Sequence, residues 1–184
     1  SGRVTTPPMA VIGRFAYQGQ GRNHPLTRHV ESEIATRGEN RMPGTKYSAY
    51  AGAAPYFDLV RRALGDLVDG EHFFDILADD IAYEVRYELG WPRLVRGRAK
   101  LMEQFEAYVG SIRLLSADRL IVNQADNGRV VILEYEVHGT ILATGADYQN
   151  RFCSIIELEN RRIARWRDYM DSHAAWKALT AGAA

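Results

Sequence analysis

The chain has 184 residues, of which 46% are hydrophobic and 25% charged, an ordinary composition for a globular protein. Its 23 basic and 23 acidic residues balance, which argues against a nucleic-acid partner because such binders carry a concentrated basic surface. No apolar run approaches the roughly 20 residues of a membrane span, and the single cysteine excludes a disulfide framework. The N-terminus shows no apolar stretch typical of a secretion signal, so we expect a cytoplasmic protein.

The charge is divided unevenly along the chain. Residues 1–46 hold seven basic and three acidic groups, whereas the rest holds 16 basic and 20 acidic groups. Four of the six prolines fall in the same stretch, which shows no sustained helix or strand period. We therefore expect an extended arm over residues 1–46 and one domain over residues 47–184. Met42-Pro43-Gly44 is a plausible native start, in which case part of what precedes it would not belong to the natural protein.

Two amphipathic helices are expected in the first half of the domain. Apolar residues recur at helical spacing over residues 50–69, and Gly70 follows as a stop signal. A short helical turn is expected over residues 71–80. The second helix is expected over residues 98–109, because four apolar or aromatic residues fall on one side of it before Gly110.

Strands are expected around and after the second helix, over residues 81–87, 120–124, 130–138, 148–158 and 163–170. Leu89-Gly90-Trp91-Pro92 is expected to break the first of them. The turn residues Asp126-Asn127-Gly128 and Glu159-Asn160-Arg161 predict two hairpins. A terminal helix over residues 172–179 has Ser172 as its expected N-cap. Helices followed by antiparallel strands predict an α+β domain with the helices on one face of a curved sheet.

Two segments near the C-terminus carry a resemblance to a known family. Residues 144–152, Thr-Gly-Ala-Asp-Tyr-Gln-Asn-Arg-Phe, and residues 162–171, which end in Trp-Arg-Asp-Tyr-Met-Asp, resemble strands of the SnoaL-like, nuclear-transport-factor-2-like superfamily. Residues 78–83 and 96–98 resemble it more weakly. The superfamily includes ketosteroid isomerases, polyketide cyclases and limonene epoxide hydrolases. The resemblance implies a cystatin-like fold, in which long helices pack on the concave face of a cone-shaped antiparallel sheet, and it implies a homodimer.

Asp168 is the first candidate for a catalytic residue. Strand alternation places Trp166, Asp168 and Met170 on one face of the last strand. Burial of a carboxyl group on such an apolar face raises its pKa and suits it to proton transfer. The resemblance implies the same role, since cyclases and epoxide hydrolases of the superfamily use an aspartate at this motif position as acid or base. The alternative is a buried aspartate held by a structural hydrogen bond or an arginine.

The other candidate site residues follow from the resemblance and from strand alternation. Tyr83 matches a tyrosine that helps to hold the attacking water in the epoxide hydrolases, although strand packing is its alternative role. Asn150 lies on a mainly aromatic face, where its amide needs hydrogen-bond partners. The expected ligand contacts are Asn150, Tyr135, Trp166, Tyr148, Val85, Val137, Phe152 and Met170. No metal ligand is expected.

The sequence departs from the epoxide hydrolases at three positions. Tyr135 and Val137 stand where these enzymes carry the Arg and Asp of an Asp-Arg-Asp relay, and Val85 replaces their water-binding Asn. Epoxide opening by paired carboxylates is therefore not expected. The base of the ketosteroid isomerases also lies near Val85, so only Glu84, Glu88 or a shifted register would supply a carboxylate there.

A polar stripe of Glu134, Glu136 and His138 has the composition of a metal or acid/base cluster. Because it alternates with Tyr135, we expect it on the convex face, as a solvated surface or a subunit interface. A register shift of one residue would turn all three side chains inward.

Two functions remain open. The first is a cofactor-free enzyme that isomerises, cyclises, dehydrates or hydrates an apolar or cyclic carbonyl compound. Asp168 would move the proton, while Tyr83, Tyr135 and Asn150 would donate hydrogen bonds to a developing negative charge. The second is a non-catalytic module that uses the same cavity to bind a small apolar ligand or to dimerise.

Overall fold

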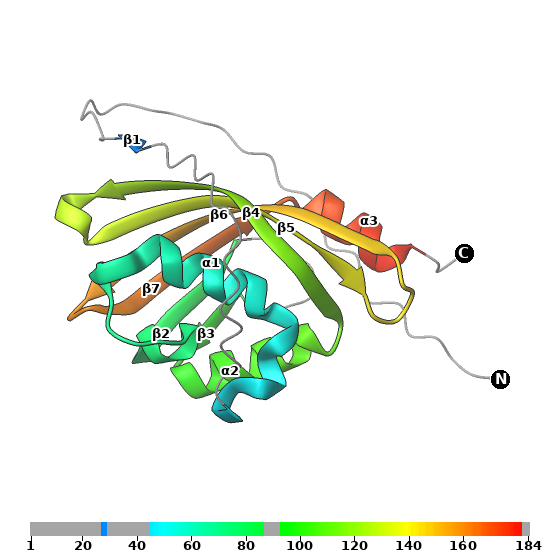
Figure 1. Ribbon diagram of the computed structural model, residues 1–184, viewed down its shortest axis with the longest axis horizontal. Coiled ribbons are helices and arrows are strands. Elements are labelled where there is room, and N and C mark those ends of the chain that lie inside the picture. The colour runs from blue at the N-terminus through cyan, green and yellow to red at the C-terminus, as the bar shows by residue number, and fades with distance from the viewer. Residues whose placement is uncertain (1–26, 29–44, 87–92, 182–184) are drawn as a thin grey trace, which may run out of the picture.

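The computed structural model describes residues 27–28, 45–86 and 93–181 (Figure 1). Its α-helices are α1 (Ala54–Leu64), α2 (Arg98–Val109) and α3 (Ser172–Thr180). Short 3₁₀ helices occupy η1 (Thr45–Ala53), η2 (Gly65–Leu67), η3 (Phe73–Ile76) and η4 (Asp126–Gly128). The strands are β1 (Thr27–Arg28), β2 (Leu77–Val85), β3 (Leu94–Arg96), β4 (Ile112–Ala125), β5 (Val130–Ile141), β6 (Asp147–Glu159) and β7 (Arg162–Met170).

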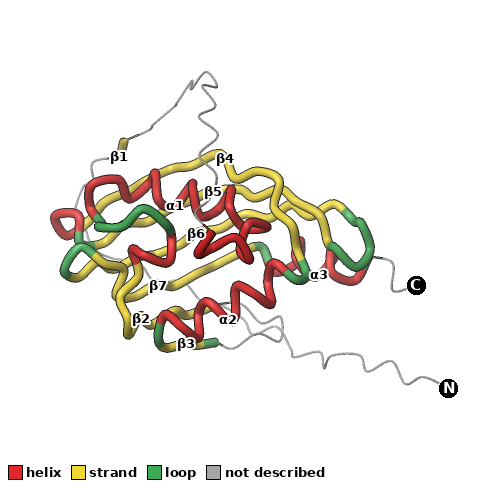
Figure 2. Tube along the Cα trace, turned by 60° about the horizontal axis from the view of Figure 1, so that its bottom comes forward, coloured by secondary structure: helices red, strands yellow, loops and turns green. Residues whose placement is uncertain are grey.

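The strands form one curved, open sheet in the order β1-β4-β5-β6-β7-β2-β3. Figure 1 shows the long strands β4, β5 and β6 arching over α1 and α2. In Figure 2 both helices lie in front of the strands, on the same face of the sheet. The α+β fold with helices on the concave face is confirmed. Its antiparallel character is broken at one place, because β2 pairs with β7 in parallel.

The helical predictions hold best for α2, which has the predicted bounds of 98–109. The first helix is shorter than predicted, because residues 45–53 and 65–67 wind as 3₁₀ helices on either side of α1. The turn predicted over 71–80 is limited to η3, and β2 already begins at Leu77. The predicted strand break at Leu89–Pro92 lies outside the described residues.

Strand β4 is much longer than predicted, since it begins at Ile112 and not at Leu120. Its pairing with β5 shifts register between Leu114 and Ser116, and again between Asp118 and Ile121. Such β-bulges interrupt the alternation of inward and outward side chains. The first half of β4 therefore lacks the sequence pattern by which strands are recognised.

Both predicted hairpins are confirmed. Asn127 and Gly128, with φ of 53° and 84°, turn the chain between β4 and β5. Asn160 and Arg161 join β6 to β7 with φ of 48° and 59°, the left-handed pair that a tight hairpin requires. The terminal helix is also confirmed, but its N-cap is Asp171, whose carboxylate accepts the backbone N–H of Ala174 at 3.0 Å. Ser172 is instead the first helical residue.

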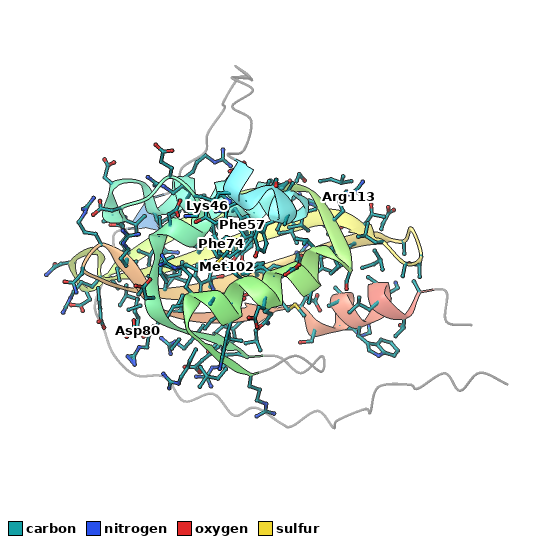
Figure 3. All side chains as sticks on the ribbon, turned by 90° about the horizontal axis from the view of Figure 1, so that it is seen from below. Lys46, Phe57, Phe74, Asp80, Met102 and Arg113 are labelled. Carbon is teal, nitrogen blue, oxygen red and sulfur yellow. The ribbon has the colours of Figure 1, made fainter. Side chains whose placement is uncertain are left out.

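The core lies between the helices and the concave face of the sheet. Helix α1 buries five apolar or aromatic residues there: Tyr56, Phe57, Leu59, Val60 and Leu64. Phe57 stacks on Phe73 with ring centroids 4.6 Å apart and meets Phe74 edge-on at 5.2 Å. Figure 3 shows Phe57 and Phe74 close together in this interior. An aromatic layer thus holds α1 and η3 at one end of the sheet.

The N-terminal stretch is described only in part. Thr27 and Arg28 form β1, which pairs with Asn123 and Val122 at the edge of β4. The boundary between an arm and a domain at residues 46 and 47 remains a prediction. Within the described ranges, no helix is long and apolar enough to cross a membrane.

Replacing Gly139 with Ala is expected to destabilise the sheet. A Cβ atom at this position would lie 2.3 Å from the backbone carbonyl oxygen of Arg113 on β4, so one of the two strands would have to move. We expect a loss of about 1–3 kcal/mol in the free energy of unfolding, measured by urea denaturation. Gly110→Ala is the matched control, since Gly110 is right-handed helical and a Cβ there meets nothing closer than 3.4 Å. Equal stability of the two variants would contradict the expectation.

Candidate active site

A cavity of about 730 Å³ lies between α2 and the concave face of the sheet, a size that suits a small organic ligand. Its lining is mainly apolar and aromatic. Seven aromatic side chains contribute to it: Tyr56, Tyr83, Phe105, Tyr108, Tyr135, Tyr148 and Phe152. The carboxyl group of Asp168 also lines it. Of the two acidic residues in this lining, Glu103 is exposed and Asp168 is buried.

Asp168 is 3% exposed and accepts three hydrogen bonds. Tyr83 Oη donates to Oδ2 at 3.0 Å, Ser154 Oγ donates to Oδ1 at 2.6 Å, and Trp166 Nε1 donates to Oδ1 at 3.4 Å. Burial raises the pKa of Asp168 to about 6, while the hydrogen bonds favour the ionised form and offset part of that rise. The group is therefore mostly ionised at neutral pH and is a stronger base than an exposed aspartate.

The two oxygens of Asp168 have different surroundings. Ser154 and Trp166 are fully buried and stand outside the described lining of the cavity, whereas Tyr83 belongs to that lining. Oδ1 is therefore held by groups behind the cavity wall, and Oδ2 lies beside a cavity-lining hydroxyl. Of the two oxygens, Oδ2 is thus the one whose hydrogen-bond partner belongs to the cavity lining.

The sequence left open that Asp168 is held by a structural hydrogen bond or by an arginine. Ser154 and Trp166 do donate such hydrogen bonds to it, and no arginine among the described residues pairs with it. An ion pair with arginine would lower the pKa of Asp168 and weaken it as a base. Hydrogen bonds from neutral groups leave the carboxylate partly destabilised by burial. The observed environment is therefore compatible with a role in proton transfer.

Tyrosine hydroxyls extend the hydrogen bonding around Asp168. Tyr135 Oη and Ser154 Oγ are 3.1 Å apart, and Tyr56 forms a further hydrogen bond with Tyr135. Burial raises the pKa of Tyr135 well above its usual value and that of Tyr148 to about 12. Both phenols therefore stay protonated over the physiological range, so they can donate hydrogen bonds to a ligand oxygen.

Most of the predicted site residues come together in this cavity. Seven of them line it: Asp168, Tyr83, Tyr135, Tyr148, Val137, Phe152 and Met170. Strand alternation accounts for six of them, which lie on the inward face that their sequence parity indicated, whereas Tyr83 was predicted from the family resemblance.

Three predicted ligand contacts, Asn150, Trp166 and Val85, do not belong to the described lining of the cavity. Asn150 Nδ2 instead donates to Tyr148 Oη and to the backbone carbonyl of Asp171, each at 3.2 Å, which ties β6 to the start of α3. Trp166 donates a hydrogen bond to Asp168 from behind the cavity wall. Val85, on β2, is the register partner of Asp168. Strand alternation predicts on which face of the sheet a side chain lies, but it does not predict whether the side chain reaches the cavity surface.

Other contributors were not predicted as site residues. Ser154, which makes the shortest hydrogen bond to Asp168, had no signal beyond its inward parity. Gln104 lines the cavity from α2. Helical spacing placed Leu101, Phe105 and Tyr108 on an apolar side, but the cavity behind that side forms only when the helix is set against the sheet.

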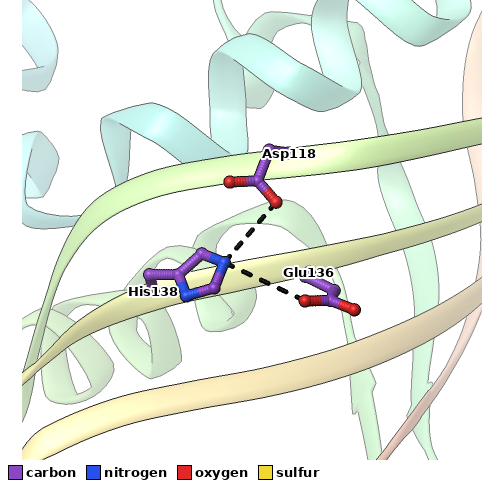
Figure 4. A group of neighbouring side chains, drawn as sticks. All are labelled: Asp118, Glu136 and His138. Carbon is purple, nitrogen blue, oxygen red and sulfur yellow. Dashed lines mark ion pairs between the residues drawn. The ribbon is translucent and has the colours of Figure 1, made fainter. Parts of the chain in front are cut away.

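The polar stripe lies outside the cavity, as alternation predicted. Figure 4 shows His138 facing Asp118 and Glu136. His138 Nε2 lies 3.5 Å from Asp118 Oδ1 and 4.0 Å from Glu136 Oε2, and the three side chains are of the types that bind metal ions. Glu136 already forms ion pairs with Arg151 at 3.0 Å and Arg119 at 3.6 Å. A divalent ion would have to displace these two guanidinium groups, so we assign no metal here.

Replacing Ser154 with Ala is expected to raise the pKa of Asp168 by about one unit, because the variant loses a hydrogen bond that favours the ionised carboxylate. The carboxyl carbon signal of Asp168 in ¹³C NMR, followed from pH 3 to pH 9, reports this pKa. Ser116→Ala is the control, since Ser116 contacts Asp118 on the opposite face. An unchanged pKa in Ser154→Ala would show that this hydrogen bond has no influence on the carboxylate.

An open curved sheet, helices on its concave face and an aromatic cavity with one buried carboxyl group define a class of small α+β domains. The SnoaL-like domain family matches residues 56–166, which is more than half of the chain. The chain belongs to the SnoaL-like domain family.

A curated relative, the uncharacterized protein YesE of Bacillus subtilis (strain 168), is 31% identical over 80 residues, which are 44% of this chain and 54% of YesE. The chain thus spans about half the length of the curated relative it matches. A solved structure of a candidate isomerase from Bacillus subtilis superposes with a TM-score of 0.57 at 21% identity, covering 71% of this chain and 92% of that one. A phenazine biosynthesis-related protein from Pseudomonas aeruginosa superposes with a TM-score of 0.54 at 21% identity, covering 77% of this chain and 90% of that one. At these identities the two structures support the fold.

Proposed function

We propose that this protein is a cofactor-free enzyme that moves a proton on an apolar, ring-bearing carbonyl compound, with Asp168 as the base. One observation carries the proposal: a buried carboxyl group with a pKa of about 6 opens onto a mainly aromatic cavity. A general base works best when its pKa lies near the working pH, and burial brings Asp168 there.

The reaction begins when Asp168 Oδ2 takes a proton from the carbon next to the ligand's carbonyl group. The C–H bond breaks, and its electron pair forms a carbon–carbon double bond while the carbonyl π electrons move to the oxygen. A cavity-lining phenol, Tyr135 or Tyr148, donates a hydrogen bond to the enolate oxygen as its charge develops. Asp168 then returns the proton to a carbon of the ligand, which restores the base.

This chemistry is common to two of the reaction types open to the site. In a β,γ-unsaturated ketone, return of the proton to the γ-carbon of the dienolate isomerises the ligand. Attack of the enolate carbon on a second carbonyl carbon closes a ring, and the π electrons of that carbonyl move to its oxygen, which takes the proton from Asp168. The proteins of similar fold include one described as a candidate isomerase and one from Xanthomonas campestris described as a candidate polyketide cyclase, with a TM-score of 0.53 at 21% identity. These descriptions name the same two reaction types that an enolate step at this site would allow.

Deuterium exchange tests the proposal without knowledge of the natural substrate. 1-Tetralone, a bicyclic ketone, is dissolved in D₂O with the protein, and loss of its α-proton signals is followed by ¹H NMR. We expect exchange above the buffer rate, rising with pH to a plateau once Asp168 is ionised, with a midpoint near 6. Binding of 1-tetralone with no catalysed exchange at any pH would favour a non-catalytic binding module.

A homodimer, which the family resemblance implied, is the second part of the proposal. No contact among the described residues of this single chain bears on it. Light scattering would give twice the monomer mass if the proposal is right, and the monomer mass would reject it.

A further inference from the structure

The helix wall of the cavity holds a polar group without a hydrogen-bond partner. Gln104, on α2, lines the cavity, and its Oε1 atom is buried with no partner among the described residues. Its neighbours Leu101 and Phe105 present apolar surface to the same space. Buried side-chain polar atoms in native proteins nearly always have a partner, so an orphan acceptor on a residue that lines a cavity points to a group that a bound ligand would satisfy.

Gln104 and Asp168 approach the cavity from different layers of the fold. Gln104 comes from α2, which covers the concave face, and Asp168 comes from β7 in the sheet. Aromatic side chains from both layers complete the walls, among them Phe105 on the helix and Tyr135 on the sheet. A ligand that fills this space is therefore expected to have an apolar ring system and to reach polar groups on both layers, Gln104 on the helix and Asp168 on the sheet among them.

The charges around the cavity favour a neutral ligand. Four charged side chains belong to its described lining: Arg96, Lys100, Glu103 and Asp168. Two are cationic and two are anionic when Asp168 is ionised, so the lining has no net charge. An ionised ligand would gain nothing from this balance, whereas a hydroxyl or N–H group is the neutral partner that a carboxamide oxygen accepts.

We infer that Gln104 selects ring-bearing carbonyl compounds that carry a second polar group, a hydroxyl or N–H donor, which hydrogen-bonds to Gln104 Oε1. Gln104 is thus a specificity-determining residue of the site. The inference rests on the proposed function only for the carbonyl group at Asp168. The recognition of the donor follows from the helix wall alone.

A matched pair of ketones tests this recognition. 6-Hydroxy-1-tetralone carries a hydroxyl donor, and 6-methoxy-1-tetralone has an acceptor at the same position but no donor. Isothermal titration calorimetry at pH 7 gives both affinities. We expect the wild-type protein to bind the hydroxy compound about five-fold more tightly, the effect of one neutral hydrogen bond.

Gln104→Met removes the acceptor and has a similar volume. We expect this variant to bind the hydroxy and methoxy compounds with about equal affinity. Met102→Leu is the control, because Met102 lies on the same helix outside the described lining of the cavity and should leave the preference unchanged. Since Gln104 Oε1 has no partner in the free protein, Gln104→Met should also fold with an equal or higher Tm. A lower Tm would indicate that the amide has a structural partner and would count against the inference.

Two results would overturn the inference: a wild-type protein without preference, or a preference that survives in Gln104→Met. If Asp168→Asn abolishes the preference and Gln104→Met does not, the hydroxyl binds at Asp168, and the inference fails while Asp168 remains the proposed base. Conversely, loss of the preference in Gln104→Met together with no exchange of 1-tetralone would support the recognition and reject the proposed reaction.

Discussion

Replacing Asp168 with Asn is expected to slow deuterium exchange into 1-tetralone about 10²–10⁴-fold, the usual contribution of a general base. The amide keeps the shape of the carboxyl group and can still accept the hydrogen bond of Ser154, but it cannot take a proton. Affinity for 1-tetralone should change little, because the aromatic walls are intact. Initial exchange rates at pH 7 and calorimetric affinities give the two quantities.

Asp80→Asn is the matched control for this experiment. Asp80 is an exposed residue of β2 outside the described lining of the cavity, so the same chemical change there should leave the exchange rate as in the wild type. Retention of most of the exchange rate in Asp168→Asn would mean that another group is the base. Equal losses in both variants would show that the rate does not depend on this site.

The same substitution is expected to change how stability depends on pH. The pKa of Asp168 is raised from 3.8 to about 6 on folding. The folded state therefore binds the proton more tightly, and this stabilisation is complete below pH 3.8 and is lost as pH rises through 6. At about 1.36 kcal/mol per pKa unit the loss is about 3 kcal/mol.

Asp168→Asn has no proton to lose, so its unfolding free energy relative to the wild type should rise by about 3 kcal/mol between pH 3 and pH 7.5. Urea denaturation of both proteins at several pH values measures this difference, and most of the rise should fall between pH 4 and pH 6. A difference that is constant with pH would show that burial does not perturb Asp168. The buried carboxyl group of Asp168 is thus expected to lower the stability of the protein at neutral pH.

Local sequence signals accounted for much of the fold. Helix α2 has a regular apolar side and a glycine at its end, and the turn between β6 and β7 has residues that accept positive φ. Each of these features depends on a few neighbouring residues. The parallel pairing of β2 with β7 does not, because the two strands are distant in sequence and meet only in the finished sheet.

The candidate site likewise has features that follow from local sequence patterns and features that depend on contacts between distant segments. Alternation predicted that Asp168 and Tyr135 face inward, and the two residues line one cavity. It did not predict that Ser154 holds Asp168 Oδ1 or that Asn150 holds the start of α3, because these contacts join different strands and a helix. Gln104 was missed since its position matters only once α2 lies over the sheet.

The most direct test of the account is the pKa of Asp168 in the wild-type protein, measured from its carboxyl carbon by ¹³C NMR with and without 1-tetralone. A base that is buried beside a ligand cavity should titrate near pH 6, and the ligand should shift that pKa because it changes the surroundings of Oδ2. A pKa near 4 that the ligand does not move would contradict the central role given to Asp168.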